Sequence, residues 1–178
     1  MRLTIGYSTT HSTIAKLIRR FTRSTVSHTY VRFYDEFLES EFVFHSDWPG
    51  VIIEDWKLFR LQNQVINEFE IDHPGVKASI QKNLEMLRKK YARWNLLRWA
   101  WFITFKRWIK RKVKNPTENP KEIICVDFTL YITNRANITA LPYDTYVPDT
   151  LMSWMIDNHK QCGLTWIFKD GKLNEVET

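Results

Sequence analysis

Hydrophobic and polar residues alternate in different ways along the N-terminal third of the chain. Residues 3–7 form a short apolar run that predicts a strand, and the polar residues 8–12 after it can cap a helix. That helix is expected over residues 13–23, where apolar residues recur at helical spacing: Ile14, Leu17, Ile18 and Phe21. Residues 26–34 then alternate as a strand does, with Thr29, Val31 and Phe33 on one face and His28, Tyr30 and Arg32 on the other.

The middle of the chain predicts further strands and two helices. Residues 41–45, 51–59 and 65–71 have strand character, and residues 46–50 form a turn after the first of them. Asp72-His73-Pro74 is a helix-start signal, and that helix is expected to reach Tyr91 with an apolar stripe of Val76, Ile80, Leu84 and Leu87. A second helix is expected through a Trp-rich basic segment to about Lys112, followed by an exposed loop at 115–120.

The last third contains one ambiguous run and one hairpin. Residues 123–133 form an apolar run around Cys125 that fits a buried helix or a strand, and periodicity alone does not separate the two. Residues 164–168 and 172–173 flank Asp170-Gly171, which is a hairpin turn signal. With no internal repeat or linker in the pattern, we predict one α+β domain over residues 1–178.

Composition excludes several classes of protein. The chain has 178 residues, of which 44% are hydrophobic, and this is too apolar for a disordered chain. Its two cysteines, Cys125 and Cys162, cannot form a disulfide framework and show no C-x-x-C spacing for zinc, which favours a reducing compartment. No apolar segment of the signal-peptide type follows Met1, so a cytoplasmic location is expected, in host cytoplasm or a virion if the chain is phage-encoded.

The formal net charge of +6 is concentrated in one segment. Residues 86–114 contain eleven basic residues, no acidic residue and four of the eight Trp. The apolar run at 99–105 is too short to span a membrane. The simplest interpretation is a helical insertion at about 91–114 that packs on the sheet with solvated charges. An anionic partner, lipid or nucleic acid, is also possible through Arg93, Arg98, Lys106, Arg107, Lys110 and Arg111.

Cys125, His28 and His45 are candidates for nucleophilic chemistry. A thiolate attacks a carbonyl well only if its pKa is lowered, which a neighbouring imidazole achieves by taking the thiol proton. A third polar group usually orients that imidazole. Composition alone favours a simpler interpretation, a core thiol and two structural histidines.

The residues around Cys125, His28 and His45 favour the catalytic interpretation over the structural one. Residues 17–31, LIRRFTRSTVSHTYV, resemble the helix-to-strand entry of the circularly permuted branch of the NlpC-type papain-like superfamily. Residues 123–128, IICVDF, are similar to the nucleophile segment of that branch, which includes YiiX-like and lecithin:retinol acyltransferase-like proteins. The predicted helix at 74–90 followed by Tyr91-Ala92-Arg93-Trp94 resembles the stretch before the cysteine. The resemblance runs from about residue 5 to residue 131, and the chain also looks similar to phage-encoded members.

The resemblance implies a permuted papain-like fold, with a small antiparallel sheet packed against helices. Cys125 would begin a helix, where the helix dipole and free N–H groups favour a thiolate and can line an oxyanion hole. His28 would be the general base, and His45 the third residue, with Asp47 and Glu54 as alternatives. Val126 and Asp127 depart from the residues usual after the cysteine, and Tyr91 lacks the usual flanking Gly and Asp. These differences leave the substrate class open.

The leading hypothesis is therefore a cysteine hydrolase of the peptidase or amidase type, which cleaves an amide or ester through an acyl-enzyme. One alternative is a non-catalytic binding or assembly module that contacts membrane, nucleic acid or a virion through the basic helix. Another is a lipid acyl hydrolase or acyltransferase with the same residues. No cofactor is expected. A metal site built from His11, His28, His45 and Cys125 has no supporting ligand spacing.

Overall fold

The computed structural model describes residues 2–91, 122–141, 147–162, 164–169 and 172–175. Its strands are β1 (Arg2–Thr9), β2 (His28–Asp35), β3 (Ser40–Asp47), β4 (Gly50–Asp55), β5 (Gln64–Asp72), β6 (Lys90–Tyr91), β7 (Glu122–Ile123), β8 (Leu164–Lys169) and β9 (Lys172–Glu175). Its helices are α1 (Thr13–Thr22), α2 (Trp56–Gln62), α3 (Val76–Asn83), the 3₁₀ helix η1 (Leu84–Arg88), α5 (Cys125–Arg135), α6 (Pro148–Asp157) and α7 (His159–Cys162).

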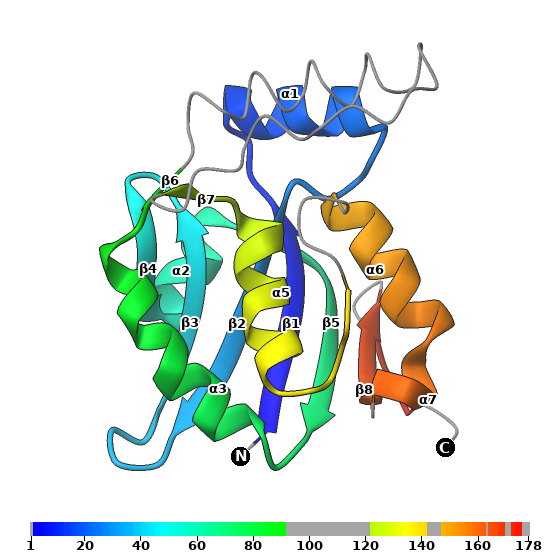
Figure 1. Ribbon diagram of the computed structural model, residues 1–178. Helices are drawn as coiled ribbons and strands as arrows, with labels where there is room; N and C mark the ends of the chain where they lie inside the picture. Colours follow the sequence, from blue (N-terminus) through cyan, green and yellow to red (C-terminus); the bar gives the residue numbers. More distant parts are fainter. Residues whose placement is uncertain (1, 92–121, 142–146, 163, 170–171, 176–178) are drawn as a thin grey trace.

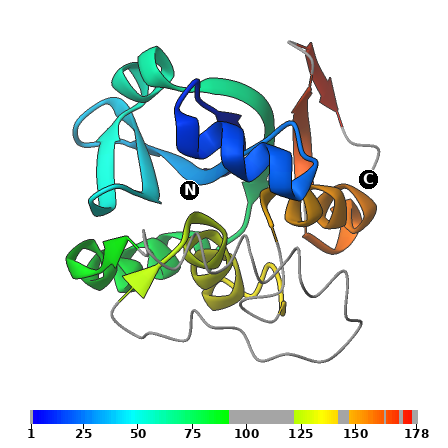
Figure 2. The ribbon, with the colours of Figure 1, turned by 90° about the horizontal axis from the view of Figure 1, so that it is seen from above.

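The described strands form one sheet in the order β7-β6-β4-β3-β2-β1-β5-β8-β9. Neighbouring strands are antiparallel except β6 and β7, which are parallel. Helices α3 and α5 lie on one face of the sheet and α2 lies on the other, while α1 crosses the end of the sheet at which α5 begins (Figures 1 and 2). The α+β class expected from the pattern is confirmed, but the sheet is larger than expected.

Each face of the sheet carries its own apolar cluster. On the α5 face, Phe44 of β3 packs edge-on against Phe128, with ring centroids 4.6 Å apart. On the α2 face, Tyr30 and Val43 pack around Phe59 of α2, all three fully buried. The strict alternation in β2 separates these two environments, because successive side chains of a strand point to opposite faces.

The structure corrects two predicted elements and decides one that the pattern left open. The strand expected over residues 51–59 ends at Asp55, whose carboxylate accepts the backbone N–H of Lys57 at 2.7 Å and so starts α2. The helix expected from residue 74 to Tyr91 is divided into α3, η1 and β6. The ambiguous run at 123–133 is mostly helical, as α5. Helices α6 and α7 were not expected, whereas the antiparallel pair β8–β9 confirms the C-terminal hairpin.

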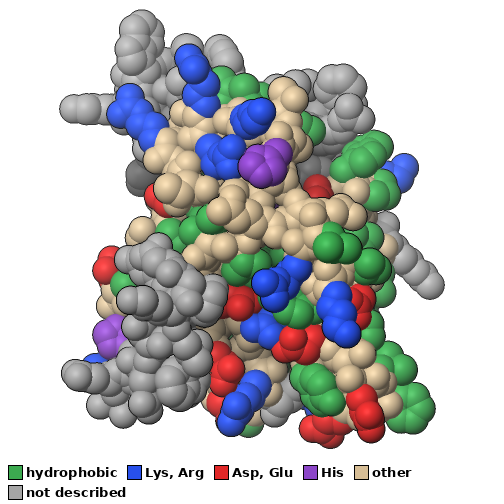
Figure 3. Space-filling model, turned by 180° about the vertical axis from the view of Figure 1, so that it is seen from behind, with side chains coloured by type: hydrophobic (Ala, Val, Ile, Leu, Met, Phe, Trp, Pro, Cys, Tyr) green, Lys and Arg blue, Asp and Glu red, His purple; other side chains and the backbone are tan. Residues whose placement is uncertain are grey.

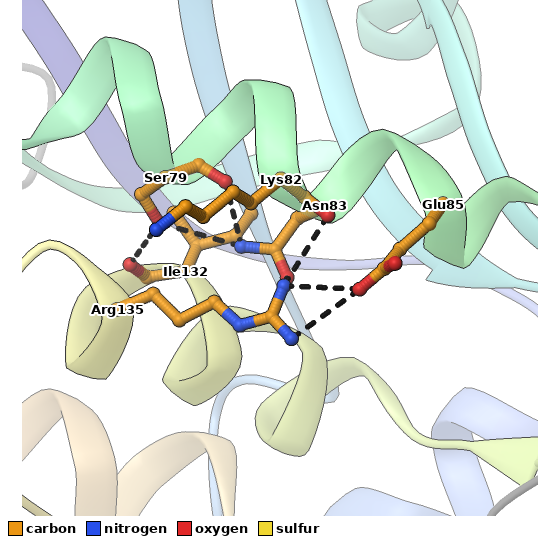
Figure 4. A network of polar contacts seen from close by, with 6 residues as sticks. All are labelled: Ser79, Lys82, Asn83, Glu85, Ile132 and Arg135. Carbon is orange, nitrogen blue, oxygen red and sulfur yellow. Dashed lines mark hydrogen bonds and ion pairs between the residues drawn. The ribbon is translucent and has the colours of Figure 1, made fainter.

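A polar network fixes α5 against α3 (Figure 4). Ser79 Oγ donates to the Ile132 carbonyl at 2.6 Å, and Asn83 Nδ2 donates to the Ser79 carbonyl at 2.8 Å. Arg135 at the end of α5 donates to Asn83 Oδ1 at 3.1 Å and pairs with Glu85 at 3.2 Å. This end of α5 is therefore held at several points, which sets the position of the other end, where Cys125 lies.

Residues 92–121 lie outside the described part of the chain, and they include most of the predicted insertion at 91–114 and the loop at 115–120. The anionic-partner candidates Arg93, Arg98, Lys106, Arg107, Lys110 and Arg111 fall in the same segment. Among the helices that the structure does describe, none combines the length and the apolar character needed to cross a bilayer.

Gly6 provides a first test of the fold. It lies opposite Tyr30 in the β1–β2 register, and a Cβ at this position would come within 2.0 Å of Tyr30 Cζ. We expect Gly6→Ala to lower the free energy of unfolding by about 1–3 kcal/mol, because the buried Tyr30 ring must move. Urea denaturation measures this change. In the double variant with Tyr30→Ala the two costs should be less than additive, and full additivity would contradict the contact.

Candidate functional site

Cys125 is the first residue of α5 and lies against the start of β2. Its side chain is buried, and its sulfur accepts backbone N–H groups from Thr29 and Val126. Thr129, one turn further along α5, donates its hydroxyl to the Cys125 carbonyl at 3.1 Å and lies 3.3 Å from the Thr29 hydroxyl. These contacts place the thiol beside Thr29, the residue that follows His28 in β2.

The segment before Cys125 is held by β3. Ser46 Oγ donates to the Ile123 carbonyl at 3.2 Å, and Phe44, two residues earlier on the same face, packs on Phe128. Ser46, Thr29 and Thr129 carry no sequence motif that marks them as site residues. Alternation in the two strands places Thr29, Phe44 and Ser46 on the α5 face, but only the tertiary contacts show what they touch.

His28, His45 and Glu54 form a hydrogen-bonded chain across three adjacent strands. His28 Nε2 lies 3.0 Å from His45 Nδ1, and His45 Nε2 lies 2.8 Å from Glu54 Oε1. In the strand register, Tyr30 is opposite His45 and Val43 is opposite Glu54. Each pair in the chain is therefore diagonal on one face of the sheet, a spacing that long side chains can bridge.

The carboxylate sets the direction of this chain. Glu54 can only accept when ionised, so His45 carries its hydrogen on Nε2 and, when neutral, presents a lone pair at Nδ1. His28 then donates from Nε2, which leaves its Nδ1 as the acceptor. The network thus selects the tautomer of His28 in which Nδ1 can take a proton.

Burial keeps both His28 and Cys125 uncharged at neutral pH. Burial, with the nearby His45, lowers the pKa of His28 to about 3, against an opposing effect of Asp47. Burial raises the pKa of Cys125 to about 12, although the N–H groups of Thr29 and Val126 act in the lowering direction. The expectation of a lowered thiol pKa at the helix N-terminus is therefore wrong for this state, because desolvation outweighs the hydrogen bonds.

The two candidate groups approach the start of β2 from opposite faces. The rings of His28 and His45 lie beside Phe59 of α2, at centroid distances of 6.3 and 5.2 Å, whereas Cys125 belongs to the helix on the other face. In the described part of the chain, no hydrogen bond joins the Cys125 sulfur to a ring nitrogen of His28. The structure brings them to neighbouring positions without a hydrogen bond between them.

The alternatives for the third residue are separated by geometry. His45 contacts His28, and Glu54 contacts His45, so both belong to one chain. Asp47 is exposed, and its carboxylate accepts the N–H of Trp48 at 2.7 Å; it acts on His28 and Cys125 through its charge. Glu54 therefore lies behind His45 and does not replace it.

A pocket of about 580 Å³ opens beside His28. Its wall is formed by the β1–α1 loop, the inner side of α1, the β3–β4 turn and the end of α2; the lining residues include Ile14, Ile18, His28, Asp47, Trp48 and Asn63. Cys125 does not line this pocket and is 6% exposed. His28 is therefore the member of the candidate site that a bound molecule would meet first.

The remaining candidates lie elsewhere or have structural partners. His11 lines the pocket, His73 Nδ1 accepts the Gly75 N–H at 3.1 Å, and His159 lies against the Ile156 carbonyl at 3.0 Å. Burial raises the pKa of Cys162 to about 11. Within the described ranges, no three His, Cys, Asp or Glu side chains are grouped as a metal site would require.

Comparison with known proteins assigns neither a family nor a function to this chain. No protein-family model matches the chain, and no curated protein matches it. What the described residues establish is an α+β protein with an imidazole–imidazole–carboxylate chain beside a helix that begins with a buried cysteine.

Proposed function

We propose that this protein is a cysteine hydrolase of permuted papain-like fold that cleaves an amide or ester bond. The observation that carries the proposal is the hydrogen-bonded chain His28–His45–Glu54, which ends beside the residue whose N–H contacts the Cys125 sulfur. A neutral imidazole backed by a second imidazole and a carboxylate can act as a general base, because the hydrogen-bonded chain leaves Nδ1 of His28 as the proton acceptor.

In this mechanism the resting site is neutral, so the thiol loses its proton as it attacks. The Cys125 sulfur forms a bond to the substrate carbonyl carbon, and its proton passes to Nδ1 of His28. The His28 imidazolium keeps its Nε2–H on the Nδ1 lone pair of neutral His45, which Glu54 holds in that tautomer. N–H groups in the first turn of α5 stabilise the oxyanion. No hydrogen bond joins sulfur and imidazole in the free protein, so the mechanism requires a local rearrangement at the start of β2 and α5 that brings the Cys125 sulfur to Nδ1 of His28.

The acyl-enzyme is then hydrolysed. His28 gives its proton to the leaving amine or alcohol, accepts one from an incoming water, and returns it to the thiol when the acyl group leaves. The departures at Val126 and Asp127 concern residues beside the sulfur, so peptide amides and acyl esters both remain substrate classes to be compared.

A second candidate function is a non-catalytic binding module on the same fold. The specific observation in its favour is that Cys125 is buried, which raises its pKa, and that it does not line the pocket. In that case the pocket binds a ligand through His28, Asp47 and their neighbours, and the histidine chain serves only to hold β2, β3 and β4 together.

Acyl-enzyme trapping separates the two candidates. The full-length chain is incubated with p-nitrophenyl acetate, quenched in acid and mapped by mass spectrometry. We expect one acetyl group on Cys125, because its sulfur contacts the N–H of Thr29, the residue next to the base His28. The Cys162→Ala variant, which removes the other buried thiol, should still be acetylated on Cys125.

Acetylation that is confined to lysines, with none on Cys125 in the wild type, would contradict the hydrolase and favour the binding module. Parallel reactions with a peptide p-nitroanilide and with phosphatidylcholine vesicles then define the substrate class. Release of p-nitroaniline indicates an amidase, whereas release of fatty acid indicates the lipid acyl hydrolase.

A further inference from the structure

Helix α1 carries two parallel exposed stripes of different chemistry. Its inner side, Ala15, Ile18 and Thr22, is buried. Lys16, Arg20 and Arg23, at i, i+4 and i+7, form a basic stripe of exposed residues on and just after the helix. Ile14, Leu17 and Phe21, at i, i+3 and i+7, form an apolar stripe beside it; Ile14 is 47% and Phe21 36% exposed, and Leu17 is half-buried.

No described residue forms an ion pair with the basic stripe. Among the described residues, the side chains of Lys16, Arg20 and Arg23 have no ion pair or hydrogen-bond partner. The first acidic residue of the chain is Asp35, at the end of β2. Helix α1 and strand β1 before it therefore contain no acidic residue, and β2 contains none before Asp35. Figure 3 shows Lys and Arg side chains gathered at the end of the molecule where α1 lies.

We infer that α1 is an interfacial helix that binds the protein to an anionic lipid surface. Cations adjacent to an exposed apolar stripe fit such a surface, since the charges meet the headgroups while the apolar side chains enter the acyl boundary. A nucleic acid would use the basic stripe and could stack a base on Phe21, but it would gain nothing from Ile14 and Leu17, which cannot stack on bases. The apolar stripe therefore favours lipid.

Binding in this way would also orient the pocket. Ile14, Ala15 and Ile18 of α1 line the same pocket as His28, so a docked α1 brings the pocket wall to the lipid surface. The inference concerns the location of the protein and does not depend on Cys125 being a nucleophile. It also involves residues separate from the Trp-rich basic segment.

Vesicle co-sedimentation of the full-length chain tests the inference. The partition coefficient onto phosphatidylcholine vesicles that contain phosphatidylglycerol should exceed that onto phosphatidylcholine alone. The variant Lys16→Gln, Arg20→Gln, Arg23→Gln should lose about a hundredfold in that partition, because each cation near an anionic surface contributes about a factor of five or more. The variant Ile14→Ser, Phe21→Ser should lose about tenfold.

The matched control is Lys57→Gln, Lys77→Gln, Lys82→Gln, which removes the same charge from exposed positions on α2 and α3. It should bind within about twofold of the wild type. Equal losses in the two triple variants, or equal binding to both kinds of vesicle, would overturn the inference. So would binding to an RNA or DNA oligonucleotide that depends on the basic stripe but not on Ile14 and Phe21, if anionic vesicles are not bound.

Discussion

Replacing Cys125 with alanine is expected to lower kcat/KM for ester or amide hydrolysis at least about a thousandfold, because no other group can form the acyl-enzyme. His28→Ala should cause a loss of similar size, since the thiol is protonated at neutral pH and needs a base to attack. The two effects should not add in the double variant, because nucleophile and base act as one unit. Steady-state kinetics on the substrate identified by trapping measures all three.

Two further variants accompany that result: one is a control, and the other tests the role of Glu54. Cys162→Ala removes a buried thiol outside the candidate site and should leave kcat/KM near the wild-type value. Glu54→Gln keeps the size of the side chain that contacts His45 but removes its charge, so it should lower kcat and change the pH–rate profile with little effect on KM. Full activity in Cys125→Ala would exclude the proposed nucleophile.

Acidification below pH 6.5 is expected to destabilise the fold through His28. Its pKa is about 3 in the folded protein against 6.5 for an ordinary imidazole, so between these values the unfolded chain binds a proton that the folded chain does not. The stabilisation is complete above pH 6.5 and is lost as the pH falls toward 3, by about 1.4 kcal/mol per pH unit.

Urea denaturation at pH 7, 6 and 5 measures this effect in wild type and in His28→Gln. Other groups also titrate in this range, so the expected result is a difference between the two proteins: the wild type should lose stability more steeply as the pH falls. Parallel dependences on pH would show that His28 is not held neutral by its surroundings, and would remove the basis for a neutral resting site.

Local pattern determined the N-terminal half of the fold well. The strands at β1, β2, β3 and β5 and the helix α1 follow from alternation and helical periodicity, which depend only on neighbours in the chain. The pattern was wrong at Trp56–Gln62, where the N-cap Asp55 starts a helix inside an apolar run. It could not choose between helix and strand for the run at Cys125, because a fully buried segment has no polar face to give a period.

The candidate site divides in the same way. The sequence alone identified His28, His45 and Cys125, placed both histidines on strands and included Glu54 as an alternative third residue. Only the tertiary structure decided that Glu54 lies behind His45 and that Cys125 meets β2 through the Thr29 N–H, because both depend on strand register and on how α5 packs. It also decided the charge state of the thiol, since desolvation depends on everything packed around the sulfur.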